Sequence, residues 1–544
     1  MPKSSLTEKI STLHRQAEEE RTKNLAKKLN LPYLDFLDIS LNPEGLMVVP
    51  ETEAEKANLI VIDVRGKELD LVLCDPADEA TKKILEGLKK RSFRYRPFLV
   101  SRSSLRQTLK KYQQLFLTKE KKGGEMEVSQ KLLNQFQFEI KNVENLKRKF
   151  AEMPDSQTSE LLELMIGSAL SLDASDVHIE AKEINALVKY RLDGMLHEII
   201  ALSRQAYELL LSRIKLLSGM KLNIRDIGQD GRFSIKLKKT TLEVRSSVVP
   251  GNYGENIVMR LLDPKTIRLD LEDLGFREDA LALIEREIRR PNGLIITTGP
   301  TGSGKTTTLY AFVKKIAQPE VKVITLEDPI EYHLSGITQT QIEPKAGYDF
   351  PSGLRSILRQ DPDILLVGEI RDSETAKTAV NCSLTGHLVF STLHTNDASG
   401  AVPRFIDLGA DARSLSSSLK LMMAQRLIRR LCQKCKNPHI PSPEVINKFR
   451  TALEDVRHPE IEKATFYQAV GCNECNGLGY KGRIGVLELI PVDFEMEKLI
   501  ASLPSRADVF ELAKKKGMIT MYQDALLKVL NGITTLEEVE RVVD

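Results

Sequence analysis

The stretch of sequence that decides the fold is Gly299-Pro300-Thr301-Gly302-Ser303-Gly304-Lys305-Thr306, followed directly by Thr307. Two glycines separated by four residues and followed by Lys and Thr are the pattern of a phosphate-binding P-loop. An apolar, β-branched run at 294–298 precedes it, and a helical pattern at 306–316 follows it. This order aims backbone N–H groups and a helix N-terminus at one point, where a phosphate is favoured. We expect Lys305 to reach the β- and γ-phosphates of a nucleotide and Thr306 to bind Mg²⁺; a glycine-rich turn without a ligand is the alternative.

The composition is that of a long, charge-balanced chain. Its 544 residues exceed the ~250–300 at which a single core stops growing, so we expect several domains. Lys and Arg number 79 against 76 Asp and Glu, and a net charge of +3 does not by itself indicate a nucleic-acid partner. No run approaches the ~18 apolar residues of a membrane-spanning helix, and the N-terminal segment lacks the apolar core of a signal peptide, which predicts a cytoplasmic protein.

Hydrophobic patterns divide the chain into six consecutive segments. These are an α/β module at 1–115, a charged linker and helix at 116–156, an α+β module at 157–272, an alternation of strands and helices at 273–431, a cysteine-containing segment at 432–480 and a last segment at 481–544. The alternation predicts a mostly parallel sheet with covering helices, and ligands at the carboxyl ends of its strands. From Ser414 onward we expect helices, apart from the cysteine region and a strand at 483–490.

Acidic residues end two apolar strand patterns that follow the P-loop. Glu369 comes directly after the run at 364–368, and Glu327 and Glu331 come after the run at 321–326. We expect Glu369 to polarise the attacking water. Glu327 is assigned to Mg²⁺ or its waters, and Glu331 to a supporting role at the same edge. Each could instead be an ordinary turn or helix-capping acid.

Two histidines flank the strand pattern at 388–393. His387 precedes the strand and His394 follows it. Each could respond to the state of the phosphate from its end of the strand, or have a purely structural role.

Four sequence boxes, taken together, resemble one protein family. GPTGSGKTTTLY, ITLEDPIEY, ILLVGEIRD and TGHLVFSTLHTN follow one another between residues 299 and 396. They look like the Walker A, Asp, Walker B and His boxes of the ATPases that drive type II secretion and type IV pilus assembly. The segments ASDVHIE at 174–180, QDGR at 229–232 and ENIVMRLL at 255–262 resemble the same family. The resemblance implies a homo-hexamer that hydrolyses ATP, with a RecA-like core, a PAS-like α+β subdomain before it and a small N-terminal docking domain.

The resemblance also assigns a set of arginines to the nucleotide phosphates. A guanidinium group makes bidentate contacts with phosphate, and such arginines can contribute ~10³–10⁵ in rate. Without the resemblance, Arg245 and Arg260 would be read as surface charges on strands. The set is Arg245, Arg260, Arg355 and Arg359.

Four of the six cysteines form two CxxC pairs, Cys432 with Cys435 and Cys472 with Cys475. In a reducing compartment such pairs indicate metal before disulfide, and four thiolates suit tetrahedral, structural Zn²⁺. Redox pairs or reduced thiols are the alternative. Similar tetracysteine segments mark the assembly and secretion ATPases of the family and are lacking in its retraction ATPases, so the resemblance favours assembly or secretion.

The resemblance implies partners for the N-terminal domain. In the family this domain docks on an inner-membrane platform protein, which places the protein at the inner face of the cytoplasmic membrane. The near-neutral net charge and the cysteine segment argue against direct nucleic-acid contact. Some relatives bind cyclic di-GMP there through a leucine- and glycine-patterned repeat; because residues 1–60 show no such repeat, we expect no cyclic di-GMP binding.

A conjugation-type nucleic-acid motor and a nonhydrolytic, nucleotide-controlled scaffold are the alternative functions. The sequence does not separate type II secretion from pilus assembly.

Overall fold

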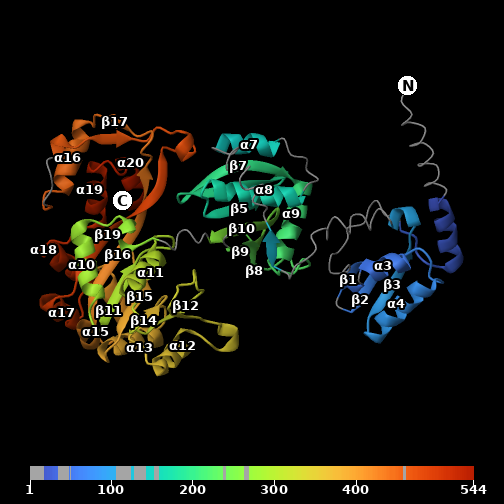
Figure 1. The fold of residues 1–544 in the computed structure, drawn as a ribbon, viewed down its shortest axis with the longest axis horizontal. Helices are drawn as coiled ribbons and strands as arrows, with labels where there is room; N and C mark the ends of the chain where they lie inside the picture. Colours follow the sequence, from blue (N-terminus) through green and yellow to red (C-terminus); the bar gives the residue numbers. More distant parts are fainter. Residues whose placement is uncertain are drawn as a thin grey trace. The chain divides into compact units, whose positions relative to one another are not determined.

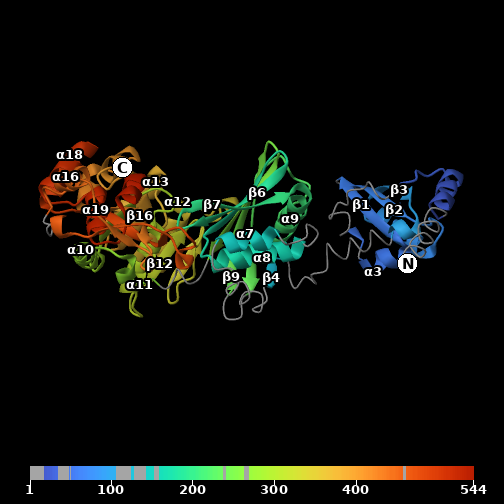
Figure 2. The ribbon, with the colours of Figure 1, turned by 90° about the horizontal axis from the view of Figure 1, so that it is seen from above.

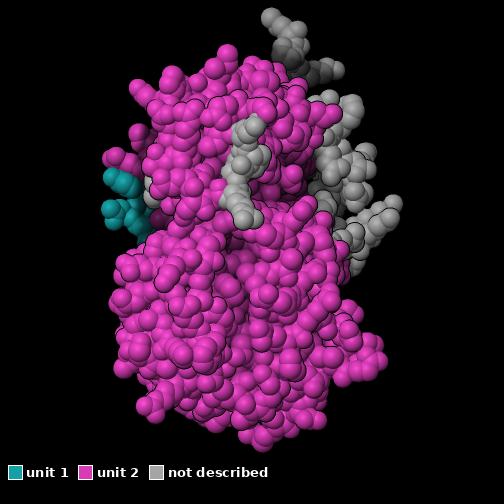
Figure 3. Space-filling model, turned by 90° about the vertical axis from the view of Figure 1, so that its left-hand side faces the viewer, with its two compact units in different colours: residues 1–126, 211–234, 246–255 teal, residues 127–210, 235–245, 256–544 magenta. Residues whose placement is uncertain are grey.

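The structure is a computed structural model that describes most of the chain. The described stretches are 18–34, 48–49, 51–65, 67–105, 124–127, 143–151, 158–236, 241–262, 269–456 and 461–543. Most of the expected linker at 116–156 therefore lies outside the described residues. The chain forms two compact units, residues 1–126, 211–234 and 246–255 in one and 127–210, 235–245 and 256–544 in the other (Figure 3). None of the helices described is both long and apolar enough to span a bilayer.

A three-stranded sheet organises the N-terminal part of the chain, which is blue in Figure 1. Its order is β1 (Leu59–Arg65), β2 (Glu68–Leu73) and β3 (Arg94–Leu99). β1 and β2 are antiparallel, whereas β2 and β3 are parallel because helix α4 (Glu79–Lys90) joins them. The α/β pattern expected in this region is thus present.

A second sheet has seven strands in the order β4-β8-β9-β10-β5-β6-β7. Helix α8 (Thr158–Ser171) packs on it (Figures 1 and 2). The fully buried Tyr190 of β6 donates its hydroxyl to the Met165 carbonyl of α8, 2.9 Å away. The other elements are β4 (Glu125–Glu127), α7 (Val143–Ala151), β5 (Asp176–Ala181), β6 (Asn185–Leu192), β7 (Met195–Ser203), α9 (Arg204–Leu217), β8 (Gln229–Lys236), β9 (Thr241–Gly251) and β10 (Gly254–Leu262).

The third sheet carries the P-loop and has the order β13-β12-β14-β15-β11-β16-β19. All neighbouring strands are parallel except β16 and β19. Alternate residues point to opposite faces, so Leu294 and Ile296 lie in one core layer and Ile295 in the other. Helices α10 (Glu278–Ile288) and α11 (Lys305–Ile316) cover the second face. Helices α12 (Phe350–Ile357), α13 (Ser373–Leu384) and α14 (Ala401–Asp407) cover the first. The strands are β11 (Gly293–Thr298), β12 (Val323–Glu327), β13 (Thr338–Gln341), β14 (Ile364–Val367), β15 (Leu388–Leu393), β16 (Leu419–Leu431) and β19 (Tyr480–Pro491).

Strand β16 corrects the expectation of helices from Ser414 onward. Its residues alternate between the two core layers, with Leu421 and Met423 in one and Met422 and Ala424 in the other. A strand buried on both faces reads as a nearly continuous apolar run, which periodicity alone does not separate from a buried helix. The rest of this region is helical outside the cysteine segment: α15 (Ala412–Ser418), α16 (Pro443–Ala452), α17 (Phe494–Ala501), α18 (Arg506–Lys515), α19 (Met521–Leu530) and α20 (Leu536–Val543), with the short strands β17 (Asn437–His439) and β18 (Phe466–Gln468).

Candidate active site

The P-loop connects the end of β11 to the start of α11, as the sequence predicts. Gly299 and Gly304 have φ angles of 144° and 89°. A Cβ atom at Gly299 would lie 2.6 Å from the backbone carbonyl oxygen of Gln425, and one at Gly304 would lie 2.8 Å from the side-chain Nε2 of Gln425. The positive φ angles favour glycine at both positions, and at Gly299 the close approach of the β16 backbone leaves no room for a side chain.

The polar groups of the loop fit a phosphate group. The Ser303 hydroxyl is buried and has no hydrogen-bond partner among the described residues. Lys305 Nζ donates to the carbonyls of Gly299, at 2.7 Å, and Pro300, at 3.1 Å, so its ammonium lies over the loop. Burial lowers the pKa of Lys305, and the nearby Glu369 carboxylate opposes this shift. An anion in the loop would meet this ammonium and the N-terminus of α11.

Glu369 and His394 lie together at the carboxyl ends of neighbouring strands. Glu369 follows β14 and His394 follows β15, and His394 Nε2 lies 3.1 Å from Glu369 Oε2. Arg371 Nε lies 2.7 Å from the same oxygen. The Glu369 side chain is 12 % exposed, so its carboxylate is held in place but still reaches solvent. A carboxylate fixed in this way is suited to accept a proton from a water molecule.

Glu327 is the most enclosed of the three predicted acids, with 3 % of its surface exposed. The Tyr310 hydroxyl of α11 donates to Glu327 Oε2. Thr325 Oγ1 donates to Oε1 at 2.5 Å, and Gln339 Nε2 donates to the same oxygen at 3.2 Å. Three donors thus fix the orientation of this carboxylate. Burial and the Glu327 charge raise the pKa of Tyr310, so the phenol remains protonated.

A cavity of about 830 Å³ opens in front of the P-loop. Its wall includes Thr301–Thr307, Glu327, Glu331, Glu369 and His394. This volume falls within the ~300–1,000 Å³ of small-molecule sites. The structure therefore brings the phosphate loop, three of the predicted acids and one predicted histidine to a single space.

Comparison with known families identifies the chain. The family model described as "Type II/IV secretion system protein" matches residues 152–541, well over half of the sequence. The chain belongs to this family. It is a secretion ATPase, and a second family model, the MshEN domain, matches residues 29–118.

Relatives of this secretion ATPase include both secretion and pilus proteins. It is 45% identical to type II secretion system protein E of Dickeya dadantii over 388 residues, which cover 71% of this chain and 76% of the relative. It is 35% identical to the type IV pilus assembly ATPase PilB of Myxococcus xanthus over 526 residues, which cover 96% and 90%. The solved structure of the Legionella pneumophila ATPase DotB has the same fold, with a TM-score of 0.52 and 22% identity over 72% of this chain and 97% of that one.

Two of the arginines that the sequence assigns to phosphate come from the module before the core. Arg260 lines the cavity, and its Nε donates to Asp176 Oδ1 at 3.0 Å. Arg245 Nη1 donates to Glu331 Oε2 at 3.0 Å. In this secretion ATPase both guanidinium groups therefore contact carboxylates, and their contact with phosphate stays a prediction.

The other two predicted arginines lie on or next to α12. Arg355 forms an ion pair with Glu374, and Arg359 Nη1 donates to the Arg355 carbonyl at 2.9 Å. Neither is part of the cavity wall formed by the described residues. The structure does not bring this pair to the P-loop of the same chain.

His387 lies at the opposite end of β15 from His394. Its Nδ1 is 3.0 Å from the Cys382 carbonyl, at the amino end of the strand. Because the cavity lies at the carboxyl end, the structure does not join His387 to Glu369. The two histidines lie at opposite ends of β15, so only one of them, His394, can line the cavity at the carboxyl end.

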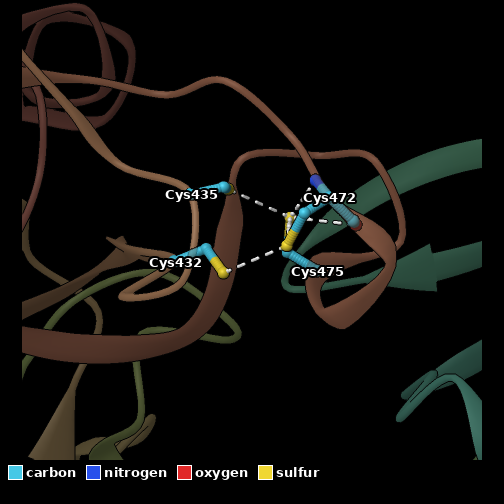
Figure 4. A group of neighbouring side chains, drawn as sticks. All are labelled: Cys432, Cys435, Cys472 and Cys475. Carbon is cyan, nitrogen blue, oxygen red and sulfur yellow. Dashed lines mark hydrogen bonds between the residues drawn. The ribbon is translucent and has the colours of Figure 1, made fainter.

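The four predicted cysteines converge from two segments of the secretion ATPase (Figure 4). Their sulfur atoms all lie within 4.8 Å of one another, with 3.8 Å between Cys432 and Cys472 and 3.7 Å between Cys435 and Cys475. Tetrahedral Zn²⁺ with Zn–S distances of ~2.3 Å sets its sulfurs about 3.8 Å apart. Backbone N–H groups of Gly471 and Gly479 donate to the sulfurs of Cys435 and Cys475. The donor set fits a zinc ion.

Several residues of the site were not found from the sequence. Arg371 contacts Glu369 and lies two residues after it in the sequence. That short spacing puts both residues at the same edge of the sheet and is the signal from which Arg371 could be predicted. Tyr310 and Gln339 contact Glu327 across three elements, and no local pattern shows this. Likewise Gln425 of β16 accepts from Thr308 Oγ1 at 2.9 Å, below the P-loop.

Proposed function

We propose that this secretion ATPase acts as a homo-hexamer whose ATP hydrolysis adds pilin or pseudopilin subunits to the filament of a type IV pilus or a type II secretion system. The observation that supports this most is the Glu369–His394 pair beside the P-loop, in a chain that aligns with a pilus assembly ATPase over 96% of its length. The protein would work at the inner face of the cytoplasmic membrane.

In this proposal Glu369 accepts the proton of the attacking water. Among the described residues, His394 and Arg371 both contact Oε2 of Glu369. We therefore assign Oε1 to the water, which would attack the γ-phosphate held by the P-loop and Lys305. His394 and Arg371 keep the carboxylate in the orientation that the reaction needs.

The site also fits a magnesium ion. When bound, Mg²⁺ neutralises charge on the β- and γ-phosphates. Thr306, exposed at the start of α11, would offer its hydroxyl. Because Glu327 already accepts three hydrogen bonds, we assign it to a water molecule of the ion and not to the ion itself. Hydrogen-bonded carboxylates of this kind orient the groups around a metal.

Domain closure would couple hydrolysis to motion. Arg260 lines the nucleotide cavity, and Arg245 contacts Glu331 of its wall. We propose that ATP draws both guanidinium groups onto its phosphates and that hydrolysis releases them. Arg355 and Arg359, which lie away from the cavity, would serve a neighbouring subunit. Phosphate-dependent closure is a common way to convert nucleotide turnover into movement.

The tetracysteine segment would hold one structural Zn²⁺, closed by four thiolates and without an open position for substrate. The N-terminal part, matched by the MshEN model at 29–118, would dock on an inner-membrane platform protein. The absence of cyclic di-GMP binding stays a prediction.

Gene replacement tests the proposal. A deletion strain that regains surface filaments or secretion with the wild-type gene, but not with Lys305→Ala, is the expected result. Filaments or secretion restored by Lys305→Ala would contradict it. Purified wild-type protein should hydrolyse ATP without DNA; turnover that requires DNA would support the conjugation-type motor, and binding without turnover would support the nonhydrolytic scaffold.

A further inference from the structure

The segment that follows β15 joins His394 to the P-loop strand. The Thr298 hydroxyl, at the end of β11, donates to the Asp397 carbonyl at 3.1 Å. The Thr395 hydroxyl donates to the same carbonyl at 2.8 Å. The position of Asp397 is therefore tied to the residue directly before Gly299 and to the residue directly after His394.

The carboxylate of Asp397 is held from the C-terminal helical region. Arg506, on the first turn of α18, donates from Nε to Asp397 Oδ2 at 2.6 Å, and its Nη2 forms an ion pair with the same oxygen at 2.5 Å. Ser399 Oγ and the Gly400 N–H donate to Oδ1 at 2.9 and 2.8 Å. The Asp397 side chain is 12 % exposed. The Asp397 carboxylate is therefore held at both oxygens, by a charge-assisted contact at Oδ2 and by two hydrogen bonds at Oδ1.

Two other elements hold the backbone of the same segment. Arg426 of β16 donates from Nη2 to the Asn396 carbonyl at 2.9 Å. Glu488 of β19 accepts from the Ala398 N–H at 3.1 Å. Each of residues 396–398 is thus held by a hydrogen bond. His394 directly follows Leu393, the last residue of β15, and its side chain contacts Glu369 Oε2. We expect a shift of Asp397 to change the position of the His394 side chain, because only Thr395 and Asn396 separate the two residues.

We infer that Arg506 is a positioning residue for ATP hydrolysis: it holds Asp397, and through the segment 394–397 it keeps His394 against Glu369. The inference rests on the proposed role of the His394–Glu369 pair. The competing explanation is that Arg506 only anchors α18 to the core. The two differ because a positioning role acts through His394, whereas an anchoring role does not.

Steady-state ATP hydrolysis by the full-length protein tests the inference. Arg506→Gln should lower kcat about tenfold with KM for ATP within about twofold, since small misplacements of catalytic groups reduce turnover more than binding. Arg506→Lys should restore part of the loss, because it keeps the charge but has neither the Nε donor nor the planar guanidinium group. Lys515→Gln, an exposed cation at the end of the same helix, is the matched control and should behave as wild type.

A double-mutant cycle with His394 decides between the two explanations. If Arg506 acts through His394, then Arg506→Gln should change kcat less than about twofold in a His394→Ala background. Effects that multiply in the double variant would overturn the inference, and so would equal losses from Arg506→Gln and Lys515→Gln. A His394→Ala protein with wild-type kcat would instead refute the proposed role of the His394–Glu369 pair, so the two failures are distinguishable.

Discussion

Replacing Tyr310 by Phe removes one hydroxyl group from beneath the nucleotide cavity. That hydroxyl is the donor to Glu327 Oε2, whereas Thr325 and Gln339 both donate to Oε1. In the variant Oε2 would lose this donor, and Glu327 is only 3 % exposed. Hydrogen bonds to charged groups contribute about 1.5–3 kcal/mol. If that loss appears in the transition state, kcat should fall about 10- to 100-fold.

The assay is ATP turnover measured over a range of Mg²⁺ concentrations, because Glu327 is assigned to a magnesium-bound water. Tyr348→Phe is the matched control: the Tyr348 hydroxyl donates at 3.2 Å to Thr340 Oγ1, a neutral acceptor, and we expect turnover within about twofold of wild type since neutral hydrogen bonds are weaker. Equal turnover by the Tyr310→Phe and wild-type proteins would refute the reasoning, as would equal losses from the two Phe variants.

Three further predictions concern charge, metal and closure. Burial raises the pKa of the Glu488 carboxyl above its unfolded value of 4.5. The folded protein therefore binds this proton more tightly than the unfolded chain, and the free energy of unfolding falls as pH rises from 4.5 through the folded pKa. Glu488→Gln should increase the urea-unfolding free energy at pH 8 and leave it unchanged near pH 4. Cys475→Ser should reduce bound zinc, measured by metal analysis, from about one ion per chain to well below that, whereas wild-type protein without zinc would contradict the four-thiolate site. Glu331→Gln, which removes a carboxylate partner of Arg245, should lower KM for ATP if Arg245 moves to the phosphates; an unchanged KM would count against that movement.

Local patterns were sufficient to predict the nucleotide edge of the core. The β-branched run at 294–298, the glycine loop and the helix after it are contiguous, so their geometry follows from neighbouring residues. Parallel strands then bring Glu369 and His394 together, because both follow carboxyl ends of adjacent strands. The same reasoning would have separated His387, which precedes its strand.

Contacts between distant residues were beyond prediction from one sequence. Arg506 and Asp397 are 109 positions apart, and Tyr310 and Glu327 are 17 apart on different elements. Strand β16 was missed for a related reason: its Leu, Met and Ala residues are good helix formers, and only burial between β11 and β19 makes them a strand. Tertiary packing decides such segments.

The Glu369→Gln variant tests most directly whether Glu369 activates the water that attacks ATP held by the P-loop. Its single-turnover hydrolysis and ATP affinity should be compared with those of Lys305→Ala. We predict that Glu369→Gln binds ATP within a few-fold of wild type but hydrolyses it about 10²–10⁴-fold more slowly, as expected for loss of a general base, while Lys305→Ala loses binding as well. Hydrolysis by Glu369→Gln at the wild-type rate, with Lys305→Ala inactive, would contradict this role of Glu369.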